Sequence, residues 1–173
     1  LLVMVPALFA LTPAPPVPPA VQAKFRKYDS KYYVVFSDLD PAVAQAGIAR
    51  ATAVGENYWE RLKGFGGKIT TKFAFYLVGD PQAYKAAGGQ AAGVAYADRL
   101  LIDASKAHES DRWFVMQHEM FHQFALNVIG AKIPVWANEG MADYFGEATW
   151  TGDGLVDGTG THHRRQYWLM KAG

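Results

Sequence analysis

A long apolar segment limits the possible folds of this 173-residue chain more than any other feature. Residues 109–129 carry apolar side chains on nearly every side, which predicts a buried central helix that ends at Gly130. The same segment contains His118, Glu119 and His122, and burying three ionisable groups is costly unless they have a partner. A metal ion is a better partner than water, so the segment predicts both a packed core and a metal site.

The spacing of these residues supports a metal site. On a helix, His118 and His122 are separated by roughly 40° of rotation and about 6 Å of rise, so both imidazoles can reach one ion. A second helix, predicted over residues 136–145, carries Glu139, which can complete a three-ligand zinc site with one open position. Asp143, one turn further along that helix, is the alternative third ligand.

Such a site activates water. Zinc lowers the pKa of a bound water towards about 7, and the carboxylate of Glu119 beside it can take the proton and pass it on. We therefore predict hydrolysis of a peptide bond in a peptide or protein substrate, with one zinc ion per chain and Glu119 as general base. Asp143 is expected to accept a hydrogen bond from the imidazole of His118, and Asn138 to play a similar supporting role.

Several other residues near the motif have predicted roles. Tyr144 and His162 are candidate donors to an oxyanion, although a packed or rim tyrosine and a solvated histidine are the alternatives. Trp136 is predicted to anchor the second helix by packing, and Gly140 to permit close approach of the two helices. Residues 93–96 form either an ordinary hairpin strand or a sheet edge that binds an extended peptide as an added strand.

The remaining chain predicts an α+β domain, in which a small mixed β-sheet supports the long helix and the glutamate-bearing helix after it. Asp-Pro pairs at Asp40 and Asp80 predict the starts of two helices, because aspartate caps a helix and proline fits its first position. The predicted strands cover residues 31–37, 72–78 and two short pieces of 93–103; the predicted helices cover 41–63, 81–87, 109–129, 136–145 and 162–170, with a loop over 151–161.

Composition excludes several classes of partner. The 17 basic and 16 acidic residues give a net charge of +1 without a basic cluster, so no nucleic-acid partner is expected. The chain has no cysteine, which excludes disulfides, thiolate zinc ligands and a lipoprotein anchor. Only His, Asp and Glu remain as metal ligands. Nothing in the sequence indicates an oligomeric state.

The N-terminal 23 residues are predicted to lie outside the folded domain. Residues 1–11 are apolar but too short to span a bilayer, and small residues at Val21 and Ala23 fit a signal-peptidase site. A basic segment and an initiator methionine are missing, so we predict either a remnant of an export signal or a disordered Pro-rich arm. The folded domain is then expected over residues 24–173, in a periplasmic, cell-surface or secreted protein.

These residues resemble a known group of enzymes. The H-E-x-x-H at 118–122 with a glutamate on the next helix is similar to the gluzincin pattern, and residues 138–143 look like the N-E-x-x-[SA]-D segment of thermolysin-like enzymes. The fuller run over residues 134–142 resembles the peptidase MA-like domains of bacteria, including a planctomycete-rich family of unknown function. The resemblance covers residues 24–145 and is specific at 118–143.

The resemblance implies a zincin-like fold, zinc bound by His118, His122 and Glu139, and a bacterial metallopeptidase with Glu119 as base. One departure matters, since gluzincins continue into a helical subdomain that forms the far wall of the cleft, whereas this chain stops at Gly173. We therefore expect a domain truncated at its C-terminus. The alternative function is a non-catalytic, zinc-stabilised extracellular binding domain, and hydrolysis of a non-peptide amide is a third.

Overall fold

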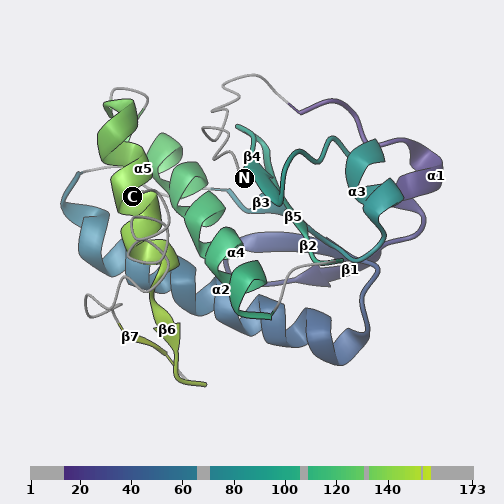
Figure 1. The fold of residues 1–173 in the computed structure, drawn as a ribbon, viewed down its shortest axis with the longest axis horizontal. Helices are drawn as coiled ribbons and strands as arrows, with labels where there is room; N and C mark the ends of the chain where they lie inside the picture. The colour runs from purple at the N-terminus through teal and green to yellow at the C-terminus, as the bar shows by residue number, and fades with distance from the viewer. Residues whose placement is uncertain (1–13, 66–70, 106–108, 131–132, 153, 157–173) are drawn as a thin grey trace, which may run out of the picture.

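A five-stranded mixed sheet forms the centre of the molecule, with strands in the order β1-β2-β3-β5-β4 (Figure 1). The computed structural model describes residues 14–65, 71–105, 109–130, 133–152 and 154–156. β2, β3 and β5 are parallel, whereas β1 and β4 pair antiparallel at the two edges. The strands are β1 Arg26–Asp29, β2 Tyr33–Ser37, β3 Phe73–Val78, β4 Gly93–Ala95 and β5 Arg99–Asp103.

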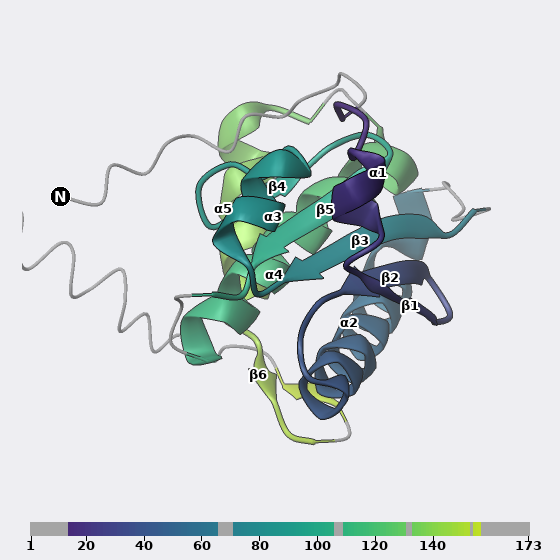
Figure 2. The same cartoon turned by 90° about the vertical axis from the view of Figure 1, so that its right-hand side faces the viewer.

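Helices cover both faces of this sheet, which confirms the α+β class. α2 and α4 lie against one face, and the short helices α1 and α3 lie against the other (Figures 1 and 2). None of the described helices has the length and apolarity needed to cross a membrane. The helices are α1 Pro19–Gln22, α2 Pro41–Leu62, α3 Pro81–Ala86, α4 Glu109–Phe124 and α5 Val135–Gly146.

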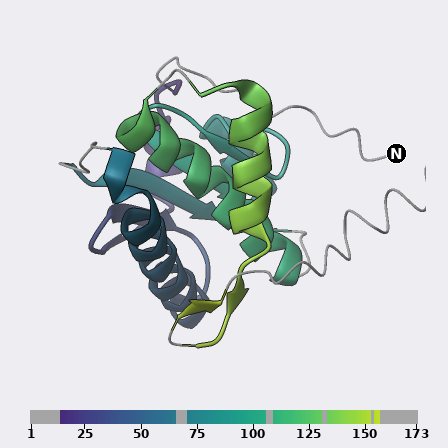
Figure 3. The same ribbon diagram turned by 90° about the vertical axis from the view of Figure 1, so that its left-hand side faces the viewer.

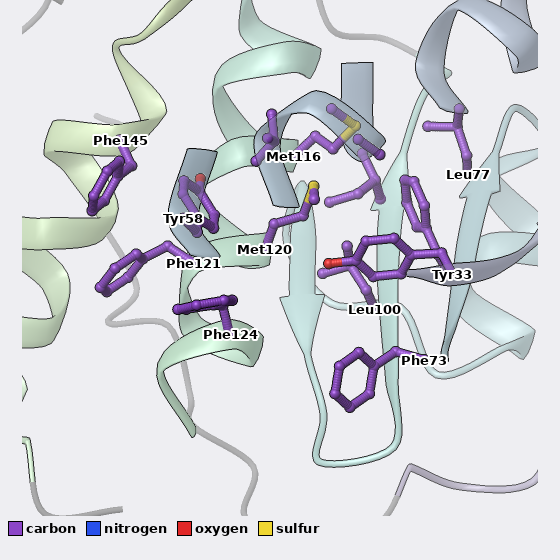
Figure 4. Close-up of a cluster of buried hydrophobic side chains, with 14 of the residues drawn as sticks. Tyr33, Tyr58, Phe73, Leu77, Leu100, Met116, Met120, Phe121, Phe124 and Phe145 are labelled. Carbon is purple, nitrogen blue, oxygen red and sulfur yellow. The ribbon is translucent and has the colours of Figure 1, made fainter. Parts of the chain in front are cut away.

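Alternation along the strands creates two hydrophobic clusters. In β3, Phe73, Phe75 and Leu77 face α2 and α4, while Tyr76 and Val78 face α1 and α3. The larger cluster continues beyond the sheet into an aromatic group where α2, α4 and α5 meet (Figure 4). Its members are Tyr58, Phe121, Phe124 and Phe145, and the rings of Phe121 and Phe145 stack with centroids 5.1 Å apart.

The helix boundaries follow the predicted caps closely. Asp40 accepts a hydrogen bond from the Ala42 amide at 2.8 Å, and Asp80 accepts one from the Gln82 amide at 2.8 Å. α4 continues into a π-helical turn over Ala125–Ile129, which was predicted as regular helix, and ends at Gly130 with φ +97°. A left-handed residue favours glycine, so this position stops the helix as expected.

Residues 14–23, which precede the predicted start of the folded domain at Lys24, pack on the sheet. Gln22 in α1 accepts a hydrogen bond from the Tyr76 hydroxyl at 2.8 Å. The Ala14 amide donates to Asp98 at 3.1 Å, and Arg99 donates to the Pro15 carbonyl at 3.1 Å. These residues form an N-terminal arm (residues 14–25) over the smaller cluster. Residues 1–13, which include the apolar run of the predicted export signal, lie outside the described residues.

Two other features differ from the prediction. The edge strand β1 was not predicted, since its charged residues Arg26, Lys27 and Asp29 lack an apolar pattern. The loop predicted over 151–161 begins inside a small hairpin, in which β6 (Thr149–Trp150) pairs with β7 (Leu155–Val156). The helix predicted over 162–170 falls outside the described residues.

Candidate metal centre

Two helices carry the centre, and they lie side by side (Figure 3). His118 and His122 project from α4 at the predicted four-residue spacing. Their Nε2 atoms are 3.0 Å apart, and their ring planes are nearly perpendicular at 86°. Both residues are buried, with exposed fractions of 8% and 2%. The helix therefore presents two imidazole nitrogens to one point in a water-poor environment.

Glu139 on α5 completes the group. Its Oε2 lies 3.5 Å from His118 Nε2, and its Oε1 lies 3.7 Å from His122 Nε2. All three ligand atoms lie within 4.8 Å of one another, an arrangement that could hold a metal ion. A tetrahedral zinc ion with bonds of about 2.0–2.1 Å holds two nitrogen ligands about 3.3 Å apart. The donor set of two imidazoles and one carboxylate therefore fits zinc in both chemistry and spacing.

Each histidine has a second polar partner on α5. Asp143 Oδ1 lies 3.1 Å from His118 Nδ1, which leaves Nε2 of that ring directed at the ligand group. Asn138, a buried residue, lies beside His122 and favours the charged form of that imidazole, which counteracts part of the lowering of its pKa. Such partners hold a ligand imidazole in one orientation and one tautomer. Glu139 rather than Asp143 lies in the group that could hold an ion, and Asp143 lies within contact of His118.

Glu119 lies on the adjoining face of α4, next to the edge strand β4. It is 7% exposed and accepts a hydrogen bond from the backbone of Ala95. The strand passes very close to the helix, because a Cβ atom at Gly93 would lie 2.9 Å from Glu119 Cγ and 2.7 Å from Val115 Cγ1. Only glycine fits there without displacing Glu119. β4 therefore holds the carboxyl group at the side of the centre.

Burial and neighbouring charges shift the pKa values of these groups in different directions. Burial raises the pKa of the Glu119 carboxyl to about 7, although the charge of His118 opposes the shift. Burial alone would lower the pKa of His118, but hydrogen bonds to Asp143 and Glu139 raise it to about 9. Burial and the charge of His118 lower the pKa of His122. The carboxylates thus stabilise positive charge at this point, as a cation site requires.

Among the described residues no strand pairs with the outer edge of β4, which lies beside α4 close to Glu119. The Tyr96 amide donates to Arg99 and the Asp103 amide donates to Ala92, so alternation directs the peptide groups of Gly93 and Ala95 away from β5. The opposite edge, β1, carries Arg26, Lys27 and Asp29, which discourage pairing with another strand. β4 has only small uncharged residues. Of the two sheet edges, β4 is therefore the one suited to accept an extended chain.

Of the two predicted oxyanion donors, only Tyr144 lies within the described residues, and it is not brought into the group. The Tyr144 hydroxyl accepts a hydrogen bond from Arg61 of α2 at 3.4 Å, and this side of α5 is turned away from Glu139. His162 lies outside the described residues. Two packing predictions are wrong. Among the described residues, Trp136 is 80% exposed and anchors nothing, and a Cβ atom at Gly140 would meet nothing within 4 Å.

The close approach of the two helices occurs instead at the other end of α5. A Cβ atom at Gly146 would lie 2.8 Å from the Phe114 ring of α4. At the same place, the buried side chain of Gln117 bonds to the backbone of α5. The sequence offered one signal for Gln117, a polar residue within an apolar helix, but the same signal marks Gln123. Comparison of the chain with known protein families, curated proteins and solved structures found no match.

Proposed function

We propose that the chain is an exported bacterial zinc metallopeptidase of the gluzincin type, with a zincin-like domain. The observation that carries the proposal is the convergence of His118, His122 and Glu139 beside the buried carboxyl group of Glu119. An ion held by these three residues would supply Lewis acidity and lower the pKa of a water molecule to about 7. Placement outside the cytoplasm rests on the apolar residues 1–11.

Glu119 acts as the general base in this proposal. In the proposed reaction its carboxyl group takes the proton of the attacking water and delivers it to the leaving nitrogen. The Ala95 amide orients the carboxyl group, and Gly93 leaves room for it. Asp143 and Asn138 keep the two imidazoles in place through the reaction.

The open edge of β4 binds the substrate. The peptide group of Gly93 and the carbonyl of Ala95 offer hydrogen-bonding groups to an extended peptide, which adds to the sheet as a sixth strand, whereas the Ala95 amide remains with Glu119. Because both residues are small, the strand supplies backbone bonds without selecting side chains. An extended peptide or protein segment is thus favoured over a compact non-peptide amide.

The alternative function is a non-catalytic, zinc-stabilised binding domain. It is favoured by the position of Tyr144, whose hydroxyl is bonded to Arg61 rather than directed at the centre. The two functions differ at Glu119, because a binding domain gains nothing from a buried carboxyl group with a raised pKa.

A peptide-library digest monitored by mass spectrometry tests the proposal. Wild-type protein loaded with zinc should cleave peptides, Glu119→Gln should bind one zinc per chain without cleaving, and His122→Ala should lose the zinc. Cleavage by Glu119→Gln at the wild-type rate would refute the mechanism. Zinc binding by wild type without any cleavage would favour the binding domain.

A further inference from the structure

We propose that Gln117 is a positioning residue that sets the place of Glu139 and Asp143 relative to the histidines of α4. The inference rests on the metal site proposed above and adds a determinant of its geometry. Gln117 directly precedes His118 and is fully buried. It touches none of the ligand atoms, so it acts through the placement of α5.

The side chain of Gln117 binds the C-terminal end of α5. The two N–H donors of its Nε2 group are shared among three carbonyl oxygens, those of Phe145 at 3.1 Å and Gly146 at 2.9 Å in α5 and that of Ala148 at 3.0 Å just beyond it. The last carbonyls of a helix have no partner within the helix, and those of a buried helix end need one from elsewhere. One side chain of α4 thus satisfies the backbone of the helix that carries Glu139.

A second contact fixes which end of the amide faces α5. Arg50 of α2 donates from Nε to Gln117 Oε1 at 2.9 Å, so the NH2 group must face the three carbonyls. The Tyr58 hydroxyl, also from α2, donates to the Gln117 carbonyl at 2.7 Å. α2 therefore holds Gln117 at both its backbone and its side chain, and the amide cannot flip without losing these bonds.

Because this contact holds the C-terminal end of α5, a small tilt of the helix there displaces residues further along it. Gly146 packs against Phe114 at the same end, whereas the first turn of α5, at Val135 and Trp136, is exposed. Glu139 lies seven residues from Gly146, about 10 Å along the helix at 1.5 Å per residue. A tilt of about 5° at the contact would move Glu139 by about 0.9 Å, well beyond the ±0.2 Å that a metal ligand tolerates.

The chain contains a matched control on the same helix. Gln123 is 1% exposed, like Gln117, and directly follows the ligand His122. Within the described part of the chain, neither amide atom of its side chain has a hydrogen-bond partner. Gln123→Met and Gln117→Met therefore make the same chemical change beside the two ligand histidines, and only the second removes contacts to α5.

The experiment compares zinc affinity by chelator competition, and the visible spectrum of bound cobalt(II), in the full chain. Wild type and Gln123→Met should agree within about twofold, whereas Gln117→Met should bind zinc about 10- to 100-fold more weakly. Its cobalt spectrum should also change, because the ligand geometry is altered. If Gln117→Met does not fold, Gln117→Asn, which withdraws the amide by one methylene, should show the same two effects.

Wild-type affinity and an unchanged cobalt spectrum in the folded Gln117 variant would overturn the inference while the metal site itself stands. An equal loss of affinity in Gln123→Met would overturn it too, since any buried glutamine would then suffice. Failure of the wild type to bind zinc would overturn both this inference and the proposed function.

Discussion

Replacing Glu119 with glutamine should stabilise the metal-free protein above pH 7. The Glu119 carboxyl is 7% exposed, and burial raises its pKa from the usual 4.5 to about 7. A carboxyl group whose pKa is higher in the folded state favours folding below the unfolded pKa, and this contribution is lost as pH rises through 7. Glutamine has no charge to desolvate, and its carbonyl can still accept the Ala95 hydrogen bond.

The size of the effect follows from the shift in pKa. A difference of about 2.5 units corresponds to about 3 kcal/mol at 1.36 kcal/mol per unit, which is an upper value because local opening admits water. The free energy of unfolding of Glu119→Gln minus that of wild type should therefore rise by about 1–3 kcal/mol between pH 4.5 and pH 8. Taking this difference between two pH values removes any pH-independent cost of the amide.

Urea denaturation in the presence of a chelator, at pH 4.5, 6, 7 and 8, measures the effect. Glu56→Gln is the control, because the carboxylate of Glu56 is half exposed in a surface ion pair with Lys31 and should give no comparable rise. If the difference in free energy of unfolding between Glu119→Gln and wild type stays constant or falls as pH rises, folding does not raise the pKa of this carboxyl group. The raised pKa that suits Glu119 to proton transfer would then be absent.

Three further predictions concern other parts of the molecule. Asp143→Asn should weaken zinc affinity about 10- to 100-fold in a chelator competition, because the amide is a poorer acceptor for His118 Nδ1; an unchanged affinity would contradict that partnership. Trp136→Ala should change the free energy of unfolding by less than about 0.5 kcal/mol in urea, since the indole is 80% exposed, and a larger loss would restore its predicted packing role. Deleting residues 1–23 should lower the unfolding free energy by about 2 kcal/mol relative to deleting 1–13, because Val17 and Val21 leave the smaller cluster; equal stabilities would return the boundary to Lys24.

The sequence predicted the central parts of this fold because local signals and burial agree there. α2 and α3 begin at Asp-Pro caps, and β3 is apolar on both sides because helices cover both faces of the sheet. The proximity of His118 and His122 was predictable for a similar reason, because residues four positions apart on a single helix lie on the same face. Glu139 required one further assumption, a short connection that returns the second helix to the first.

The errors occur where tertiary contacts override local patterns. Trp136 is large and aromatic, like many residues that pack in a core, yet no element covers the first turn of α5 in the described structure. The sequence does not show whether Gly140 or Gly146 permits the close approach of the two helices. Only the crossing of α4 and α5 determines this position. The N-terminal arm was missed because its Pro-rich composition is typical of an extended chain, and its bonds to Asp98 and Arg99 span more than eighty residues.

The attachment of that arm has a mechanical consequence. Ala14 and Pro15 are hydrogen-bonded to Asp98 and Arg99, at the turn between β4 and β5. A force applied to the N-terminal end of the described chain would therefore load the β4–β5 hairpin before it reached the packed centre of the sheet. The strand proposed to receive substrate would then separate first, so tension on the arm would weaken substrate binding in the proposed enzyme.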